Sequence, residues 1–127
     1  MRAKNIYAKQ SVQTAPKEQL MLMLFNTAIK NLKLAEQGDW TTDRDKLTAT
    51  AERAMDIIIE LRQTLNHQMA PELCKQLEEL YTYVISRIAV GLTSDQSQHF
   101  SDALVALSPI AEAFNLAIKK TKEGGQP

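Results

Sequence analysis

The chain has 127 residues, which is enough for one domain with a hydrophobic core and too few for two. Fifteen Lys and Arg residues balance fifteen Asp and Glu residues, so the basic surplus of a general nucleic-acid-binding protein is absent. The single cysteine excludes an intrachain disulfide and favours a reducing compartment. We therefore expect a cytoplasmic protein that has no nucleic-acid partner.

The first 13 residues are mostly polar, with Ile6, Tyr7 and Val12 as isolated apolar residues. We interpret residues 1–13 as a mobile N-terminal arm rather than a packed element. No apolar run follows the basic start, so we expect no signal peptide. The longest strongly apolar run, residues 20–25, is far shorter than the ~20 residues of a membrane span, so we expect no stable membrane insertion.

Apolar residues at helical spacing predict a first helix over residues 14–37. Pro16 suits its first turn, where a missing N–H costs nothing, and Gly38 suits the position just after its last turn. Met23 and Leu34 fall on the outward face, where internal packing does not explain them. The residues beside the apolar seam of this helix are Leu20, Leu22, Leu24 and Ile29.

The second predicted helix, residues 42–65, carries more apolar surface than one core face uses. Met55 and Ile59 lie on one flank of its seam and Ile57 lies on the other. They widen the apolar sector to roughly 200°, against the roughly 100° that a surface helix needs. Because surplus apolar surface is usually covered by another polypeptide, these flanks predict a protein-binding surface. The seam consists of Leu47, Ala51, Ala54, Ile58, Leu61 and Leu65.

Two further helices are predicted over residues 71–92 and 95–121. Pro71 suits the first turn of the third helix, and Asp95 or a neighbour caps the fourth. Pro109 lies in the middle of the fourth helix, where it should produce a kink. Long helices joined by short connections are antiparallel neighbours, so we predict an all-α fold. The expected architecture is one domain over residues 1–127, an antiparallel up-down four-helix bundle with a flexible N-terminal arm.

Residues that could support catalysis or metal binding lack the required partners. His67 and His99 have neither a Glu three residues earlier nor a second His four residues away, and we expect them to be exposed polar residues. Cys74 lies at a seam position without a CxxC partner, which favours core packing. Glu78 and Glu79 fall on the solvent-exposed face of the third predicted helix, where we expect solvated charges. The sequence therefore predicts no enzyme, with no catalytic residue, metal or cofactor.

Four segments in a fixed order resemble one known family, the flagellin-specific export chaperones called FliS. The resemblance covers about residues 7–119. Departures are Phe25-Asn26-Thr27 where the family usually has Tyr-Asp-Gly, Asn66–Pro71 in place of a Gly-rich turn, and Phe114 where Trp is common. The matching segments are Tyr7-Ala-Lys-Gln-Ser-Val-Gln-Thr14, Leu20-Met-Leu-Met-Leu-Phe-Asn-Thr-Ala-Ile29, Ile58-Ile-Glu-Leu61 and Leu77-Glu-Glu-Leu-Tyr-Thr-Tyr83.

The resemblance implies a chaperone that binds the disordered C-terminal segment of flagellin, prevents premature polymerisation and supports export through the flagellar type III secretion system. It also implies an export gate protein and a flagellar regulator as further partners, and it suggests that Ile6 and Tyr7 occupy the groove when it is empty. We expect a monomer or weak homodimer. The expected partner-binding residues are Ile6, Tyr7, Val12, Leu20, Met23, Leu24, Met55, Ile57, Ile59 and Tyr83.

Three alternatives remain open. One is a helical-bundle chaperone or regulator of a different secreted or regulatory partner. Another is a bundle enzyme or metal carrier, which elemental analysis would reveal. The third is self-association, with the surplus apolar face buried in a homodimer.

Overall fold

The computed structural model describes residues 16–94 and 97–124 of the chain, and within these ranges it contains four α-helices. The predicted arm, residues 1–13, lies outside the described residues. Helix ends differ from the predicted ends by three residues or fewer, because capping and fraying decide the last turn rather than apolar periodicity. The helices are α2 (Pro16–Gln37), α3 (Arg44–Gln63), α4 (Pro71–Ser94) and α5 (Ser97–Gly124).

Each helix packs against the next one along the chain, and α2 also packs against α5. The connections are short, so neighbouring helices run in opposite directions. The prediction of an all-α, up-down four-helix bundle is therefore confirmed.

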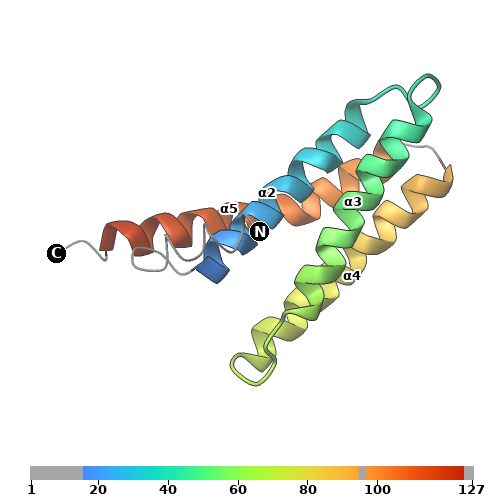
Figure 1. The fold of residues 1–127 in the computed structure, drawn as a ribbon. Coiled ribbons are helices and arrows are strands. Elements are labelled where there is room, and N and C mark those ends of the chain that lie inside the picture. The colour runs from blue at the N-terminus through green and yellow to red at the C-terminus, as the bar shows by residue number, and fades with distance from the viewer. Residues whose placement is uncertain (1–15, 95–96, 125–127) are drawn as a thin grey trace.

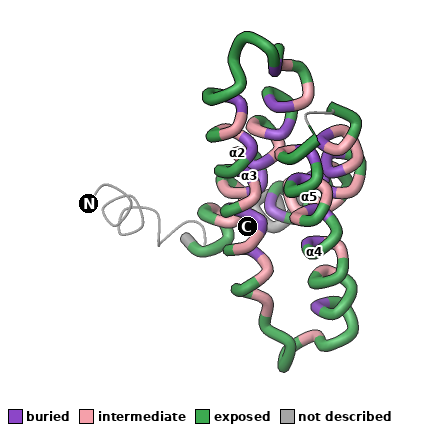
Figure 2. The backbone as a smooth tube through the Cα atoms, turned by 90° about the vertical axis from the view of Figure 1, so that its right-hand side faces the viewer, coloured by how far each residue is buried: buried purple, intermediate pink, exposed green. Residues whose placement is uncertain are grey.

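The four helices do not stay together along their whole length. Near the α2–α3 connection all four lie close to one another, whereas toward the other end the α3–α4 pair and the α2–α5 pair diverge (Figure 1). Buried positions gather where the helices lie together, and the turn that joins α3 to α4 is mostly exposed (Figure 2). The bundle thus has a closed end and a divergent end.

The core follows the inner faces of all four helices. On α3 the predicted seam is buried from Leu47 to Leu61, whereas Leu65, its last predicted member, is half-buried just beyond the helix. The core residues with the largest enclosed side chains are Phe25, Leu32, Ile58, Leu61, Val84, Ile88, Phe100 and Leu107.

The closed end is built around the aromatic residue Trp40, which lies in the α2–α3 connection. Its indole N–H donates a hydrogen bond of 2.8 Å to the carbonyl oxygen of Ala35, one of the last carbonyls of α2. Such carbonyls have no partner within their own helix, so the indole completes the end of α2. The Trp40 ring also stacks on Phe100 of α5, with ring centroids 5.4 Å apart and planes 3° from parallel.

Two glycines at the closed end allow side chains of neighbouring helices to lie directly against the backbone. The Gly38 N–H donates to the Leu34 carbonyl at 3.0 Å, as expected for a residue just after a helix. A Cβ at Gly38 would lie 2.5 Å from a methyl carbon of Leu47. A Cβ at Gly91 of α4 would lie 2.8 Å from the ring of Phe100. Glycine is therefore required at both positions because a side chain would clash with a neighbouring residue, and not because the backbone adopts a left-handed conformation.

One stretch of α5, Ser97–Lys119, is long and apolar enough to cross a membrane by length and composition. The apolar residues of this stretch are spread over 23 positions and do not form one uninterrupted run. Phe100, Leu104 and Leu107 of this stretch are buried in the bundle core. Core packing thus accounts for part of its apolar composition. α5 continues through Pro109 as an unbroken helix.

Candidate protein-binding site

The divergent end comprises residues 16–24 of α2, residues 61–80 around the α3–α4 turn, and α5 from Phe114 onward. The helix pairs separate there (Figure 1), and several large apolar side chains of these segments are exposed. Leu73 of α4, for example, has 56% of its surface exposed. The exposed large apolar residues of the divergent end are Leu20, Met23, Met69, Leu73 and Leu116. Patches of this kind commonly mark protein-binding surfaces.

Three aromatic rings lie where the helix pairs begin to separate. Phe25 of α2 lies between Tyr81 of α4, with centroids 6.4 Å apart, and Phe114 of α5, with centroids 5.4 Å apart. Tilted rings at such distances attract one another beyond their burial of area. We call Phe25, Tyr81 and Phe114 the aromatic floor of the divergent end.

Beyond the aromatic floor the core splits into two parts. Cys74 is buried, as predicted for a small apolar residue, and its thiol donates to the carbonyl oxygen of Asn66 in the α3–α4 turn at 3.3 Å. Ile118 of α5 is also buried, yet neither residue belongs to the continuous core. The continuous core therefore ends near the aromatic floor, and Cys74 and Ile118 are buried separately beyond it.

The side chain of Tyr81 is deeply buried. Only 2% of its surface is exposed. Burial raises the pKa of Tyr81 to about 12, and the nearby thiol of Cys74 adds to the effect. The phenol of Tyr81 is therefore held in its neutral form within the bundle.

The predicted partner-binding residues are distributed over three helices. Leu20 and Met23 of α2 are exposed and Leu24 beside them is half-buried, all three at the divergent end. Tyr83 of α4 is exposed one turn closer to the closed end. Ile6, Tyr7 and Val12 lie outside the described residues.

The expectation that both flanks of α3 are uncovered is wrong for Ile57. This residue has 5% of its surface exposed and belongs to the core, while Met55 and Ile59 are half-buried. The reason is geometric. α3 packs against both α2 and α4, and a helix with two neighbours needs a wider apolar sector than a helix with one. Most of the apparent surplus is therefore used inside the bundle.

Several exposed apolar residues were not among the predicted site residues. Leu73 and Leu116 belong to the divergent end. Their helical spacing is the same as that of buried residues, so the sequence pattern did not mark them as exposed. Met69 lies in the turn between α3 and α4 and is exposed. The remaining exposed residues outside the divergent end are Leu34, Val90 and Val105.

A polar cluster ties α4 to α5 near the closed end. The Arg87 guanidinium contacts the His99 ring and lies 3.5 Å from a carboxylate oxygen of Asp102. Gln98 donates to the other oxygen of that carboxylate at 2.8 Å. His99 is therefore half-buried and paired, which corrects the expectation of an exposed residue, whereas His67 is exposed as predicted. This cluster holds two helices together.

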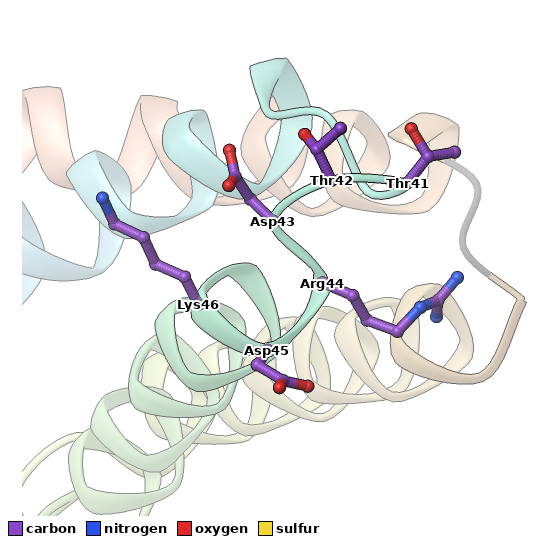
Figure 3. A pocket seen from close by; sticks show the side chains of 6 residues that line it. All are labelled: Thr41, Thr42, Asp43, Arg44, Asp45 and Lys46. Carbon is purple, nitrogen blue, oxygen red and sulfur yellow. The ribbon is translucent and has the colours of Figure 1, made fainter.

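A shallow polar hollow lies at the start of α3, with a volume of about 330 Å³. Its side chains carry both charges and point in different directions (Figure 3). The adjoining connection is ordered by Asp39, whose carboxylate accepts hydrogen bonds from the N–H and hydroxyl of Thr41. These bonds lower the pKa of the Asp39 carboxyl. The hollow is lined by Thr41, Thr42, Asp43, Arg44, Asp45 and Lys46.

Among the described residues, no group of three or more His, Cys, Asp or Glu residues is placed to hold a metal ion. Glu78 and Glu79 are exposed on α4, as predicted. Within the described ranges, the apolar surface of the divergent end is thus the feature that the fold offers to another molecule.

Comparison with known proteins relates nearly the whole chain to one family. The family model "Flagellar protein FliS" matches residues 1–121. Three bacterial proteins named flagellar secretion chaperone FliS are similar to the chain. The one from Salmonella typhimurium is 31% identical over 114 residues, covering 86% of this chain and 82% of the relative. The one from Bacillus subtilis is 26% identical over 117 residues, covering 92% and 86%. The one from Vibrio cholerae is 24% identical over 115 residues, covering 88% and 82%.

The four-helix fold and these matches together define a helical-bundle chaperone of flagellar secretion. The chain belongs to the FliS family. The resemblance that the ordered segments suggested is therefore confirmed, and a chaperone family fits the prediction of a protein without catalytic activity.

Proposed function

We propose that the chain is a cytoplasmic chaperone that binds the disordered C-terminal segment of flagellin. By covering that segment it prevents premature polymerisation and keeps flagellin available to the flagellar type III secretion system. The observation that carries this proposal is the exposed apolar surface of the divergent end in a member of a secretion chaperone family.

The divergent end suits an amphipathic segment that folds as it binds. Such a segment is recognised through apolar side chains at helical spacing, and the faces of the two helix pairs offer apolar contacts to it. The ordering of a disordered chain costs several kcal/mol, about 2–5 or more, which the interface must offset. We therefore expect the complex to bury clearly more than the ~1,600 Å² of a standard interface.

Methionine at this surface fits the same function. Met23 and Met69 are exposed, and Met21 and Met55 are partly buried against the core. Thioether side chains are flexible and polarisable, so they repack around varied client side chains. A surface of this kind would tolerate the sequence variation of a client helix.

Further partners belong to the same proposal. An export gate protein would receive the chaperone–flagellin complex, and a flagellar regulator would bind the free or loaded chaperone. The chain itself would act as a monomer or weak homodimer, with Ile6 and Tyr7 of the arm covering apolar surface in the absence of a client.

The test is co-purification of the chain with full-length flagellin and with flagellin lacking its last ~40 residues, the length of two ~20-residue helices. We expect binding to full-length flagellin and loss of binding on truncation. Retention of the truncated flagellin would overturn the proposed site. A chain that binds neither form would overturn flagellin as the client.

A further inference from the structure

One face of α5 points away from both helices against which α5 packs. The contact with α2 is marked by Asn115, which donates to Asn26 at 3.4 Å, and the contact with α4 by Asp102, which pairs with Arg87. With 3.6 residues per turn, four exposed residues between these two edges fall within a sector of roughly 60°. We call them the outer face of α5, and they are Val105, Pro109, Glu112 and Leu116.

The outer face of α5 carries much less charge than the exposed faces of the other helices. Val105 is 73% exposed and Leu116 is 61% exposed, and Glu112 is the one charged residue in positions 103–118. Contiguous exposed apolar surface of this kind is usually covered by another molecule. In contrast, exposed positions in the middle of α3 are occupied by Glu52, Arg53, Asp56 and Glu60.

The outer face of α5 is self-complementary in its apolar residues. When two copies of a helix pack antiparallel across a two-fold axis, each residue faces a residue at the same distance on the other side of the axis. If the axis passes through the middle of the outer face, Val105 of each copy faces Leu116 of the other. Pro109 then faces Glu112, so the acidic residues of the two copies do not face each other.

The charges that flank the outer face follow the same symmetry. Asp102 lies three residues before Val105, and Lys119 lies three residues after Leu116. The same two-fold axis therefore places Asp102 of each copy opposite Lys119 of the other. Lys119 is exposed, and 32% of the Asp102 side chain remains exposed beside Arg87. Both the apolar residues and the flanking charges thus favour a second copy of this chain as the occupant.

A membrane surface fits the outer face less well than a second copy does. Helices that lie on anionic membranes carry mainly Lys and Arg beside their apolar face. Here the apolar residues are accompanied by Asp102 and Glu112 as well as by Lys119. A second copy matches charges of both signs, because each copy supplies the opposite charge at the opposing position.

We propose that two copies of the chain associate through the outer faces of α5, antiparallel and with Val105 facing Leu116 of the second copy. This inference goes beyond the proposed function, because it assigns the surface of self-association and needs no client. Residues 102–119 span about 26 Å, and a single helix face of that length is small beside the ~800 Å² that each partner contributes to a standard interface. The dimer is therefore weak, with a dissociation constant on the order of 0.1 mM.

The first experiment is sedimentation equilibrium of the full chain, without a client, from about 10 µM to about 1 mM, the range around this dissociation constant. It compares Val105→Ser with the matched variant Val90→Ser, which alters an exposed valine of α4. Each substitution occurs twice in a two-fold dimer, so Val105→Ser should weaken association at least about tenfold. Val90→Ser should leave it unchanged. Circular dichroism verifies that both variants are folded.

The second experiment tests the register with introduced cysteines. In the proposed dimer, positions 105 and 116 of opposite copies are neighbours, whereas each lies about 16 Å along the axis from its own equivalent, too far for a disulfide. Under mild oxidation, a mixture of Val105→Cys and Leu116→Cys chains should therefore form a covalent dimer, and neither chain alone should do so. Cys74 is buried and present in every sample, so the unaltered chain gives the background.

Three results would overturn the inference. One is a chain that stays monomeric up to about 1 mM, which would leave the outer face to another occupant. Another is an equal loss of association in Val105→Ser and Val90→Ser. The third is crosslinking of either cysteine variant alone as readily as the mixture. None of these measurements contains flagellin, so the proposed function is tested separately by its own co-purification experiment.

Discussion

Gly91 allows the ring of Phe100 to lie directly against the backbone of α4. A Cβ at this position would be 2.8 and 2.9 Å from two ring atoms, and Phe100 is itself fully buried and stacked on Trp40. Alanine is favoured over glycine in a helix by about 1 kcal/mol, but overpacking of an enclosed site costs about 1–3 kcal/mol. The net effect of these two contributions is a loss of roughly 1 kcal/mol and at most about 2 kcal/mol in the free energy of unfolding of Gly91→Ala, measured by urea unfolding followed with circular dichroism.

The control for this variant is Ser86→Ala, an exposed position on the same helix. Its effect should stay within about 0.5 kcal/mol. If Gly91→Ala proves as stable as the unaltered chain, the ring of Phe100 moves aside at no cost and the contact does not limit the packing of α4 on α5.

The buried phenol of Tyr81 makes the free energy of unfolding depend on pH in the alkaline range. Burial raises its pKa from 10.0 to about 12 in the folded chain. Between these values the unfolded chain has lost the phenol proton while the folded chain still binds it, so stability falls as the pH rises. We expect the unaltered chain to lose roughly 2 kcal/mol of unfolding free energy across this interval beyond what Tyr81→Phe loses.

Urea unfolding at several pH values between 9 and 12 measures this difference. Lysine side chains titrate in the same interval, but they do so in every variant and cancel in the comparison. A Tyr81→Phe curve parallel to that of the unaltered chain would contradict the buried position of the phenol.

Among the helices, α5 contains a residue that is unfavourable in a helix interior, Pro109. Pro109 lies inside Ser97–Gly124, where it has no N–H to donate to the carbonyl four residues earlier. Proline at an interior position of a helix costs about 3 kcal/mol relative to alanine, and part of that cost is relieved by local adjustment. Because the residue is exposed, Pro109→Ala should raise the free energy of unfolding by about 1–3 kcal/mol without disturbing the core.

Urea unfolding followed with circular dichroism at 222 nm measures the effect of Pro109→Ala. Glu112→Ala, at an exposed position one turn further along, serves as the control and should change little. A loss of stability in Pro109→Ala would mean that the backbone conformation imposed by proline at this residue is required for the packing of α5 against α2 and α4.

The helices and their seams were predictable because burial in a bundle repeats with the period of the helix. Leu47, Ala51, Ala54 and Ile58 illustrate this, since each falls on the predicted seam and each is buried. Ile57 was misplaced because the width of a buried sector depends on how many helices surround it, which periodicity along one helix does not record. His99 was misplaced for a similar reason, since its partner Arg87 lies on another helix.

For the molecule as a whole, the divergence of the two helix pairs is the property that sequence did not reveal. Leu73 falls seven residues before Leu80, which packs against the core, yet Leu73 is exposed. The helix pairs diverge toward the α3–α4 turn (Figure 1). Crossing angles depend on the fit of side-chain ridges between helices, so a pattern on one helix does not predict them. The family resemblance supplied the class of client, and the structure supplied the end of the bundle at which we propose that it docks.

This arrangement leads to a prediction about binding. Leu73 and Val105 are both exposed apolar residues, at 56% and 73%, but Leu73 belongs to the divergent end and Val105 to the half of α5 near the closed end. Leu73→Ser should weaken binding of a flagellin C-terminal peptide about tenfold, whereas Val105→Ser should leave it unchanged. Calorimetric titration measures both. Equal effects of the two variants would argue against the divergent end as the site.

The position of Trp40 has a practical consequence. It is the single tryptophan of the chain, and it is fixed between α2 and Phe100 at the end of the bundle opposite the proposed docking surface. Its fluorescence emission should change sharply when the bundle comes apart and stay almost constant when a tryptophan-free ligand is added. The fluorescence of Trp40 thus reports whether the bundle is folded. The folded fraction can therefore be followed during a titration independently of how much ligand is bound.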